Sequence, residues 1–300
     1  MKSDNYSSQS HYYSVLMSMN RIARIAADVL ISRATWGGSQ NFLGARWVEW
    51  IVDNAPRAAR RRVAMRLLSL SPHYFYDRDL AAEDARNRRS RLILADELIA
   101  PYLAPGARVV DYGCGPGYLA AAVARRAAHV DAVDISRGAL ACARVLNGLS
   151  NITYRTPAEL RACASPARVG TADVAYSFAV VQHLRTDALI DVLAQLAAAV
   201  RPGGVLLLHF ALAGEHGYRT EGQWLSDGSL TGRAKLRYGL NCFGRSAAEM
   251  VDLVARSGFT DVVTRPLSGS IAIPGDDIPN QHLLTARRAV AAVPEVLVTT

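Results

Sequence analysis

A run of alternating glycines that begins at residue 113 carries the strongest chemical signal in this sequence. Two β-branched residues lead into Asp111, and glycines follow at Gly113, Gly115 and Gly117 before an alanine-rich apolar segment. Glycine has no Cβ, so its backbone can take positive φ values and a ligand can approach the main chain closely. The first turn of a helix adds unpaired N–H groups. The pattern predicts a buried strand, a tight turn and a helix that together form a cradle for a small molecule.

The spacing of the glycines separates two classes of nucleotide cofactor. A dinucleotide site has the form G-x-G-x-x-G or A, and counted from Gly113 the third small residue would fall on Tyr118. The dinucleotide pattern therefore fails by one position. The segment DYGCGPG instead has the form D-x-G-x-G-x-G and resembles the class I S-adenosylmethionine-dependent methyltransferases. The resemblance implies S-adenosyl-L-methionine as cofactor, with Asp111 and the three glycines at its methionine half.

A second carboxylate, Asp134, ends the next short hydrophobic segment, about 20 residues beyond the glycines. A carboxylate at a strand end can accept hydrogen bonds from both hydroxyls of a ribose. We therefore predict that Asp134 binds the ribose of the cofactor and that Ile135 lies beside it. This feature alone does not separate a methyl donor from NAD, because both carry an adenosine ribose.

The segment from Thr156 to Glu159 has the form of a helix start. Thr156 serves as N-cap, Pro157 takes the first helical position and Glu159 completes a capping box. Members of the resembled family carry an aspartate in this loop that bonds the adenine amino group, and Pro157 occupies the corresponding place here. We expect a backbone amide near Ala158 to contact the ring edge instead.

The segment ADVAYSFAVVQHL resembles the fourth strand of the family and the loop after it. Ligands of doubly wound sheets bind beyond the carboxyl ends of the strands. Ser177 and Phe178 are therefore predicted to contact the cofactor, and His183 to approach the reacting centre. Methyl transfer from a sulfonium depends mainly on placement, and a base is needed only for a poor nucleophile such as a hydroxyl. His183 and His209 are the candidate bases, and for each the alternative is a hydrogen-bonded structural histidine.

Strands and helices alternate around these residues. Strands are expected at 109–111, 130–133, 152–154, 173–177 and 205–210, with helices between them, and the stretches 259–264 and 282–286 suit an antiparallel final pair. Such alternation predicts a parallel sheet covered by helices on both faces. The predicted fold is α/β, a Rossmann-like doubly wound sheet of seven strands, mostly parallel with an antiparallel last strand, plus an N-terminal helical extension.

The domain organisation follows from where this alternation stops. The expected regions are a helical extension or lid over 1–90, a methyltransferase core over 91–290, an acceptor-capping insert over 211–243 and a tail over 291–300. The extension opens with an amphipathic pattern from Ile22, and the aromatic run Tyr74 to Tyr76 is a candidate lid by resemblance. The insert lacks clear periodicity, and a connection this long is usually functional.

Composition narrows the class of protein. The formal charge is +8, with only two lysines among 34 basic residues, so a bias toward arginine explains the charge without nucleic acid. The basic run Arg57 to Arg66 is interpreted as a solvated helix face, with adhesion to anionic lipid as the alternative. The four cysteines show neither disulfide nor zinc spacing, so a cytoplasmic protein without metal is expected.

These observations predict a methyltransferase that acts on an oxygen of a small-molecule metabolite, with nitrogen and carbon as other acceptor atoms. The sequence contains no N/D-P-P-Y/F motif and no proline-cysteine nucleophile, so nucleic acid is not the expected acceptor. The alternatives are a lipid-directed methyltransferase and a catalytically silent cofactor-binding or RNA-binding module. A homodimer is left open.

Overall fold

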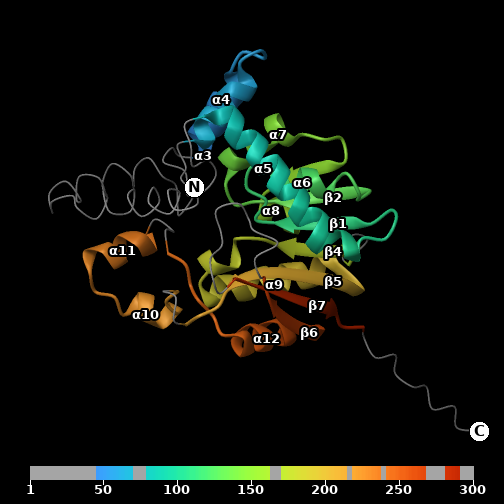
Figure 1. Cartoon of the computed structure of the whole chain (residues 1–300), viewed down its shortest axis with the longest axis vertical. Coiled ribbons are helices and arrows are strands. Elements are labelled where there is room, and N and C mark those ends of the chain that lie inside the picture. Colours follow the sequence, from blue (N-terminus) through green and yellow to red (C-terminus); the bar gives the residue numbers. More distant parts are fainter. Residues whose placement is uncertain are drawn as a thin grey trace, which may run out of the picture.

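The computed structural model describes residues 45–69, 79–162, 170–214, 218–237, 241–267 and 281–290. Seven strands form one sheet in the order β3-β2-β1-β4-β5-β7-β6 (Figure 1). The strands are β1 Arg108–Tyr112, β2 His129–Val133, β3 Ile152–Arg155, β4 Ala172–Ser177, β5 Val200–Ala211, β6 Phe259–Pro266 and β7 Gln281–Arg288. The first five run parallel, and β7 lies antiparallel between β5 and β6. The predicted Rossmann-like sheet with an antiparallel last strand is confirmed.

Helices cover both faces of the sheet. The helices that flank the core are α5 Leu80–Leu94, α6 Tyr118–Val123, α7 Arg137–Asn147, α8 Pro157–Ala162, α9 Thr186–Ala199 and α12 Ala247–Arg256. Two hydrophobic clusters form the core, one on each face of the sheet. Val109 belongs to the cluster that includes residues of α5 and α6, whereas Val110 belongs to the cluster that includes residues of α9 and α12. Adjacent strand residues point to opposite faces, so a strand that is apolar at both positions must be covered twice. The strand is thus buried on both sides, and its carboxyl end is fixed for the glycine loop.

The helical segment that leads to β1 begins well before residue 91, where the core was expected to start. Asp79 caps α5 by accepting hydrogen bonds from the amides of Ala81 and Ala82. A π-helical turn, η1 Ala95–Ile99, and a 3-10 turn, η2 Ala100–Tyr102, follow α5 directly. The sequence hides this start because α5 is rich in arginine and weakly amphipathic. The expected boundary at residue 90 falls inside α5.

Two further helices, α3 Ala45–Asn54 and α4 Arg60–Leu68, lie beside α7 (Figure 1). They share a third apolar cluster with α7 and with Tyr118 at the start of α6. The N-terminal part is therefore helical where the structure describes it. The amphipathic pattern from Ile22, the aromatic run Tyr74 to Tyr76 and the tail over 291–300 lie outside the described residues.

The insert after β5 contains two short helices that the sequence did not predict, α10 Glu221–Leu225 and α11 Leu230–Arg237. Thr220 and Gln223 form a reciprocal capping box at the start of α10. One and two helical turns are too short to show a 3.6-residue period, so the pattern reads as irregular. The capping residues were the signal that could have located α10.

Candidate functional site

The glycine loop has the backbone geometry that the sequence predicts. The φ angles of Gly113, Gly115 and Gly117 are +85°, +50° and +77°, in the region that L side chains rarely adopt. A Cβ at Gly113 would clash with Val180, and one at Gly117 would clash with Tyr154. Both conformation and close packing therefore require glycine at these two positions. The loop joins the end of β1 to α6, so the first-turn amides of α6 face the same end of the sheet.

Asp134 lies beside this loop, at the end of β2. Its carboxylate accepts hydrogen bonds from the amide of Gly115 at 2.8 Å and from the amide of Ser136 at 2.8 Å. Burial raises the pKa of Asp134, and the two amide donors oppose that shift. Ile135 is 76% exposed, an unusual position for a large apolar side chain. The carboxylate and the exposed apolar side chain thus stand together at the cradle.

The turn after β3 confirms the predicted capping box. The amide of Thr156 donates to the Glu159 carboxylate at 2.7 Å, and the amide of Glu159 donates to the Thr156 hydroxyl at 3.2 Å. The Thr156 amide lowers the pKa of Glu159 through this hydrogen bond. Ala158 is exposed in the first turn of α8. The Glu159 carboxylate is thus engaged in capping α8. The backbone near the exposed residue Ala158 remains the candidate for contact with the adenine ring of the cofactor.

Asp111 is a buried carboxylate at the end of β1. Its side-chain atom Oδ2 has no hydrogen-bond donor within the described part of the chain. Burial raises the pKa of Asp111 to about 8, the nearby Tyr176 hydroxyl opposes the shift, and the charge of Asp134 adds to it. A positively charged ligand group beside this oxygen would favour the ionised carboxylate and lower the pKa of Asp111.

The titration of Asp111 predicts a pH-dependent stability. The pKa is higher in the folded protein than in the unfolded chain, so between about pH 4 and pH 8 the folded state retains a proton that the unfolded chain releases. The contribution of Asp111 to the unfolding free energy therefore falls as the pH rises through this window. Asp111→Asn cannot titrate, and its melting temperature should rise relative to wild type as the pH increases from 5 to 8.5.

Asp84 provides the matched control for this thermal-unfolding series. Burial raises the pKa of Asp84, but hydrogen bonds from Tyr118 and Arg88 outweigh it, and the net pKa is lowered. Asp84→Asn should therefore lose a constant amount of stability over the same pH range. Parallel curves for Asp111→Asn and Asp84→Asn would contradict the protonated state of Asp111.

The chain after β4 closes the cradle on its other side. Ser177 is fully buried, and its hydroxyl has no partner in the part of the chain that the structure describes. Phe178 stacks face to face on His209 of β5, with ring centroids 5.6 Å apart. Ala179 has a φ of +58°, which costs free energy in a residue other than glycine. Ser177 and Phe178 thus lie beside the glycine loop, but buried rather than open to solvent.

His209 is buried in a way that fixes its tautomer. The amide of Ala179 donates a hydrogen bond to Nδ1 of His209 at 3.1 Å. Burial lowers the pKa of His209 to about 4, and the neighbouring Gln281 amide opposes this shift. The ring is therefore neutral near pH 7, accepts at Nδ1 and carries its proton on Nε2. With Nδ1 engaged and Nε2 protonated, His209 has no lone pair available to a substrate.

His183 has the opposite arrangement. It ends the 3-10 turn η3 Val181–His183, and its Nδ1 lies 2.9 Å from the carbonyl oxygen of Asn241. A carbonyl only accepts, so Nδ1 carries the proton and the lone pair lies on Nε2. Burial lowers the pKa of His183, and the bond to Asn241 opposes that shift. Val180, which precedes η3, packs against Gly113, so this histidine stands close to the cradle.

The segment from Asn241 to Arg245 holds η3 in place. No local pattern in the sequence marks this segment as a partner of η3. The amide of Phe243 donates to the carbonyl of Gln182 at 2.6 Å. The Arg245 guanidinium donates to the carbonyls of Val181 at 3.0 Å and Leu184 at 2.6 Å. Arg245 is 2% exposed, and these two hydrogen bonds replace part of the hydration that its guanidinium loses on burial. The end of the insert and the loop after β4 thus form one connected unit.

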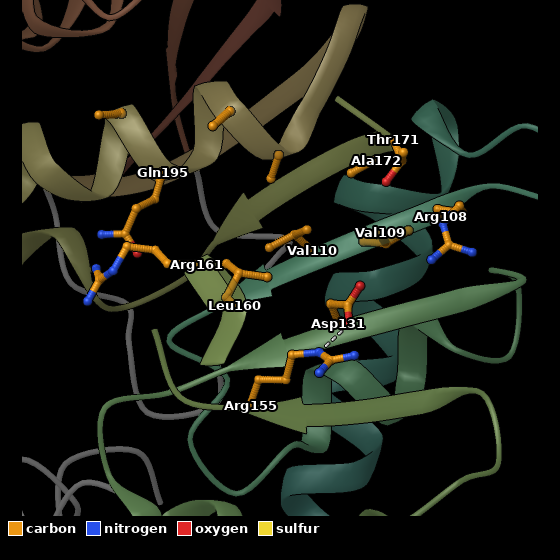
Figure 2. A pocket seen from close by; sticks show the side chains of 13 residues that line it. Arg108, Val109, Val110, Asp131, Arg155, Leu160, Arg161, Thr171, Ala172 and Gln195 are labelled. Carbon is orange, nitrogen blue, oxygen red and sulfur yellow. Dashed lines mark hydrogen bonds and ion pairs between the residues drawn. The ribbon is translucent and has the colours of Figure 1, made fainter. Parts of the chain in front are cut away.

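A separate cavity of about 310 Å³ lies on the α9 face of the sheet. Figure 2 shows its lining, from the first half of β1 to α8 and α9, with the ion pair between Arg155 and Asp131 at one side. None of the thirteen lining residues is a predicted site residue. The predicted residues gather instead at the opposite, carboxyl ends of the strands.

Within the described residues, no three histidine, cysteine or acidic side chains are grouped as metal ligands. In that same portion of the chain, no helix combines the length and hydropathy that a bilayer crossing needs.

The cradle fits a nucleoside cofactor with a cationic group. The glycine loop has positive φ angles, Asp134 offers a carboxylate beside it, and Ile135 offers an exposed apolar face. The unpartnered oxygen of Asp111 suits a positive charge. These features come from the ends of only two strands, β1 and β2, and all lie at the carboxyl edge of the parallel sheet.

Comparisons with known sequences agree on one family. A family model described as Methyltransferase domain matches residues 82–264. A ubiquinone biosynthesis O-methyltransferase of Hahella chejuensis is 36% identical over 121 residues, which cover 39% of this chain and 47% of that protein. The enzyme of the same name from Burkholderia multivorans is 33% identical over 99 residues, covering 33% and 42%. The matches therefore span less than half the length of these curated relatives.

Two solved methyltransferase structures align with this chain at TM-scores below 0.5. Phosphoethanolamine N-methyltransferase 2 of Haemonchus contortus, in complex with S-adenosyl-L-methionine, has a TM-score of 0.48 at 16% identity over 67% of this chain and 52% of that one. An S-adenosylmethionine-dependent methyltransferase from Mesorhizobium loti has a TM-score of 0.44 at 22% identity over 63% of this chain and 95% of that one.

Proposed function

The chain belongs to the class I S-adenosylmethionine-dependent methyltransferases, and on that premise we propose that it methylates a hydroxyl oxygen of a small-molecule acceptor. The observation that carries the proposal is the tautomer of His183, whose proton is held on Nδ1 by the carbonyl of Asn241. An oxygen acceptor needs a base, whereas an amine does not. The curated relatives named above, which are O-methyltransferases, support the same acceptor atom.

We assign the cofactor contacts as follows from the geometry of the cradle. Asp134 accepts hydrogen bonds from the ribose hydroxyls, and Ile135 and the backbone near Ala158 contact the adenine. The remaining contacts, to the methionine half, come from Asp111, Gly113, Gly115, Gly117, Ser177 and Phe178. Asp111 is placed to face a positive charge, because its unpartnered oxygen otherwise stays buried without compensation.

The bound cofactor supplies the electrophilic methyl group. The protein holds the acceptor oxygen in line with it, which can contribute on the order of 7 to 11 kcal/mol. Nε2 of His183 accepts the hydroxyl proton, and the resulting positive charge is shared through Nδ1–H with the carbonyl of Asn241. The pKa of His183 is lowered, so the ring is neutral and ready to accept a proton at pH 7.

His209 has a positioning role in this proposal. Its Nδ1 holds the amide of Ala179, and its ring supports Phe178. Together they fix the strained turn that leads from β4 to η3. The two predicted histidines therefore have different roles in the proposal, since His183 has its lone pair on Nε2 whereas His209 fixes the loop that carries His183.

Ligand-dependent thermal unfolding tests the cofactor and the acceptor in sequence. A ligand at 100 times its dissociation constant adds about 2.7 kcal/mol to the unfolding free energy, or roughly 5 to 10 °C in a domain of this size. We expect this shift with S-adenosylmethionine and its demethylated product, and none with NAD. Methyl transfer is then measured on matched aromatic compounds that carry either a hydroxyl or an amine. Turnover of the amines alone would overturn the assignment of an oxygen acceptor.

A further inference from the structure

Two tryptophans stand on the outer face of α3. Trp47 is 64% exposed and Trp50 is 59% exposed, and their rings meet edge to face with centroids 6.1 Å apart. On the opposite face of α3, Val48 and Val52 are buried against the core. The orientation of the helix is therefore fixed by its valines, and the two largest side chains of α3 are left in water. Large aromatics are mostly buried in soluble proteins, so a pair of exposed neighbours indicates a contact surface.

The helix beside them is strongly basic. Arg57, Arg62 and Arg66 are exposed on or next to α4, whose buried residues Ala64 and Leu68 face the same apolar cluster as α3. Within the described part of the chain, no carboxylate lies within ion-pair distance of these three arginines. Residues 45–69 contain six arginines and two acidic residues, a net charge of +4 out of +8 for the whole chain. Half of the excess charge thus lies on residues 45–69.

Both helices turn their buried faces to α7, so their outer faces point away from the rest of the molecule (Figure 1). We refer to the outer residues Trp47, Trp50, Arg57, Arg62 and Arg66 as the α3–α4 face. Tryptophan is the aromatic side chain preferred at membrane interfaces, where its apolar body and N–H are both accommodated. Arginine pairs with the phosphates of lipid head groups and is attracted to anionic surfaces.

We propose that the α3–α4 face is a docking surface for an anionic lipid bilayer. The tryptophans enter the interfacial region, and the arginines contact lipid phosphates. The proposal rests on the positive charge and the exposed aromatic rings together. Arginines alone would suit nucleic acid equally well. Exposed apolar rings, in contrast, are stabilised most by transfer into an apolar phase. It is independent of the acceptor proposed above.

The position of this face has a consequence for the cradle. Tyr118, the first residue of α6, belongs to the same apolar cluster as α3 and α4. Its hydroxyl donates to Asp84 at 2.7 Å, and Asp84 also pairs with Arg61 of α4 at 2.5 Å. The glycine loop is therefore linked to α3 and α4 through Tyr118 at the start of α6. On a membrane, this link would hold the cradle at a fixed distance from the lipid surface.

Vesicle binding of the full chain tests the proposal. We expect sedimentation with vesicles of phosphatidylcholine mixed with phosphatidylglycerol, and weak sedimentation with phosphatidylcholine alone. Phosphatidylglycerol brominated on its acyl chains should quench the tryptophan fluorescence. Each arginine near an anionic surface contributes about a fivefold factor, so Arg57→Gln, Arg62→Gln and Arg66→Gln together should weaken binding on the order of 100-fold. Trp47→Ser with Trp50→Ser should weaken binding about 10-fold and remove most of the quenching.

Matched variants elsewhere on the surface distinguish docking from general charge. Arg125, Arg233 and Arg265 are exposed on other elements, and changing all three to glutamine removes the same charge. Ile190 and Leu225, 47% and 52% exposed, are the apolar controls when changed to serine. Equal losses in test and control sets would overturn the proposal. So would binding to a single-stranded RNA with no binding to anionic vesicles, which would make the face a nucleic-acid surface.

Discussion

Replacing Asp134 by alanine is expected to weaken S-adenosylmethionine binding by about 100-fold or more, because two hydrogen bonds to a carboxylate are lost and each contributes about 1.5 to 3 kcal/mol. The same change removes the acceptor that holds the amides of Gly115 and Ser136. The glycine loop and the ribose contact therefore weaken together. Isothermal titration with S-adenosylmethionine measures the loss, and far-ultraviolet circular dichroism checks that the sheet remains.

Asp131 gives the control for this variant. It lies on the same strand, three residues before Asp134, and pairs with Arg155 at 2.9 Å beside the cavity of Figure 2. Asp131→Asn removes a carboxylate from β2 without touching the cradle, so its cofactor affinity should match wild type. Asp134→Asn keeps one acceptor oxygen and should bind with intermediate affinity. Undiminished binding by Asp134→Ala would remove this residue from the site.

Changing His183 to glutamine is expected to lower the turnover number by 100- to 10,000-fold at saturating cofactor, the range in which a general base contributes. Glutamine can still donate to the carbonyl of Asn241, so η3 should keep its place, but it cannot accept a proton near pH 7. Cofactor affinity should stay unchanged. Steady-state kinetics and titration of the cofactor, measured on the same preparations, separate the two quantities.

The pH profile sharpens this test. Burial lowers the pKa of His183 below its usual value of 6.5, so wild-type turnover should stay level near neutrality and fall only in more acidic solution, where the ring becomes protonated. The glutamine variant should lack that fall. His129→Gln, on the surface beside Asp131, serves as the control and should keep wild-type kinetics. Full turnover by His183→Gln would show that the acceptor reacts without a base, as an amine does.

The sequence predicted those parts of the site that are built from neighbouring residues. The glycine loop, the carboxylate of Asp134 and the capping box of Thr156 and Glu159 each occupy one turn, so their spacing alone specifies the geometry. The sheet order follows from the same cause, because alternating strands and helices leave few topologies. The sheet, the glycine turn and the capping box were confirmed, whereas the ribose contact of Asp134 stays a prediction.

The parts that could not be predicted depend on contacts between distant residues. Asn241 and Arg245 lie about sixty positions from the η3 turn that they bond, and nothing in their local pattern marks them. The difference between His183 and His209 likewise comes from one partner atom each, a carbonyl in one case and an amide in the other. Such partners are fixed only when the chain has folded.

The exposure of Trp47 and Trp50 shows a third kind of limit. From sequence, a cluster of aromatics is best interpreted as core, because most aromatics are buried. The valines of α3 were the better guide to its buried face, since they repeat at helical spacing. The residue type of the tryptophans alone would therefore misplace them, whereas the spacing of Val48 and Val52 indicates which face of α3 is buried.

The bonds between the insert and the η3 turn bear on how this enzyme could acquire a new substrate. The insert supplies the carbonyl that orients His183, and Arg245, two residues beyond the insert, anchors the turn. Grafting an insert from a relative would therefore exchange the acceptor cap and the proton-accepting machinery in one step. A transplanted segment that ends before Asn241 leaves the native residue at position 241, and His183 keeps its native tautomer. A segment that runs through Arg245 replaces that residue, so the tautomer of His183 then depends on the donor sequence. The junction of a chimaera, more than the cap that it carries, would then decide whether the hybrid turns over.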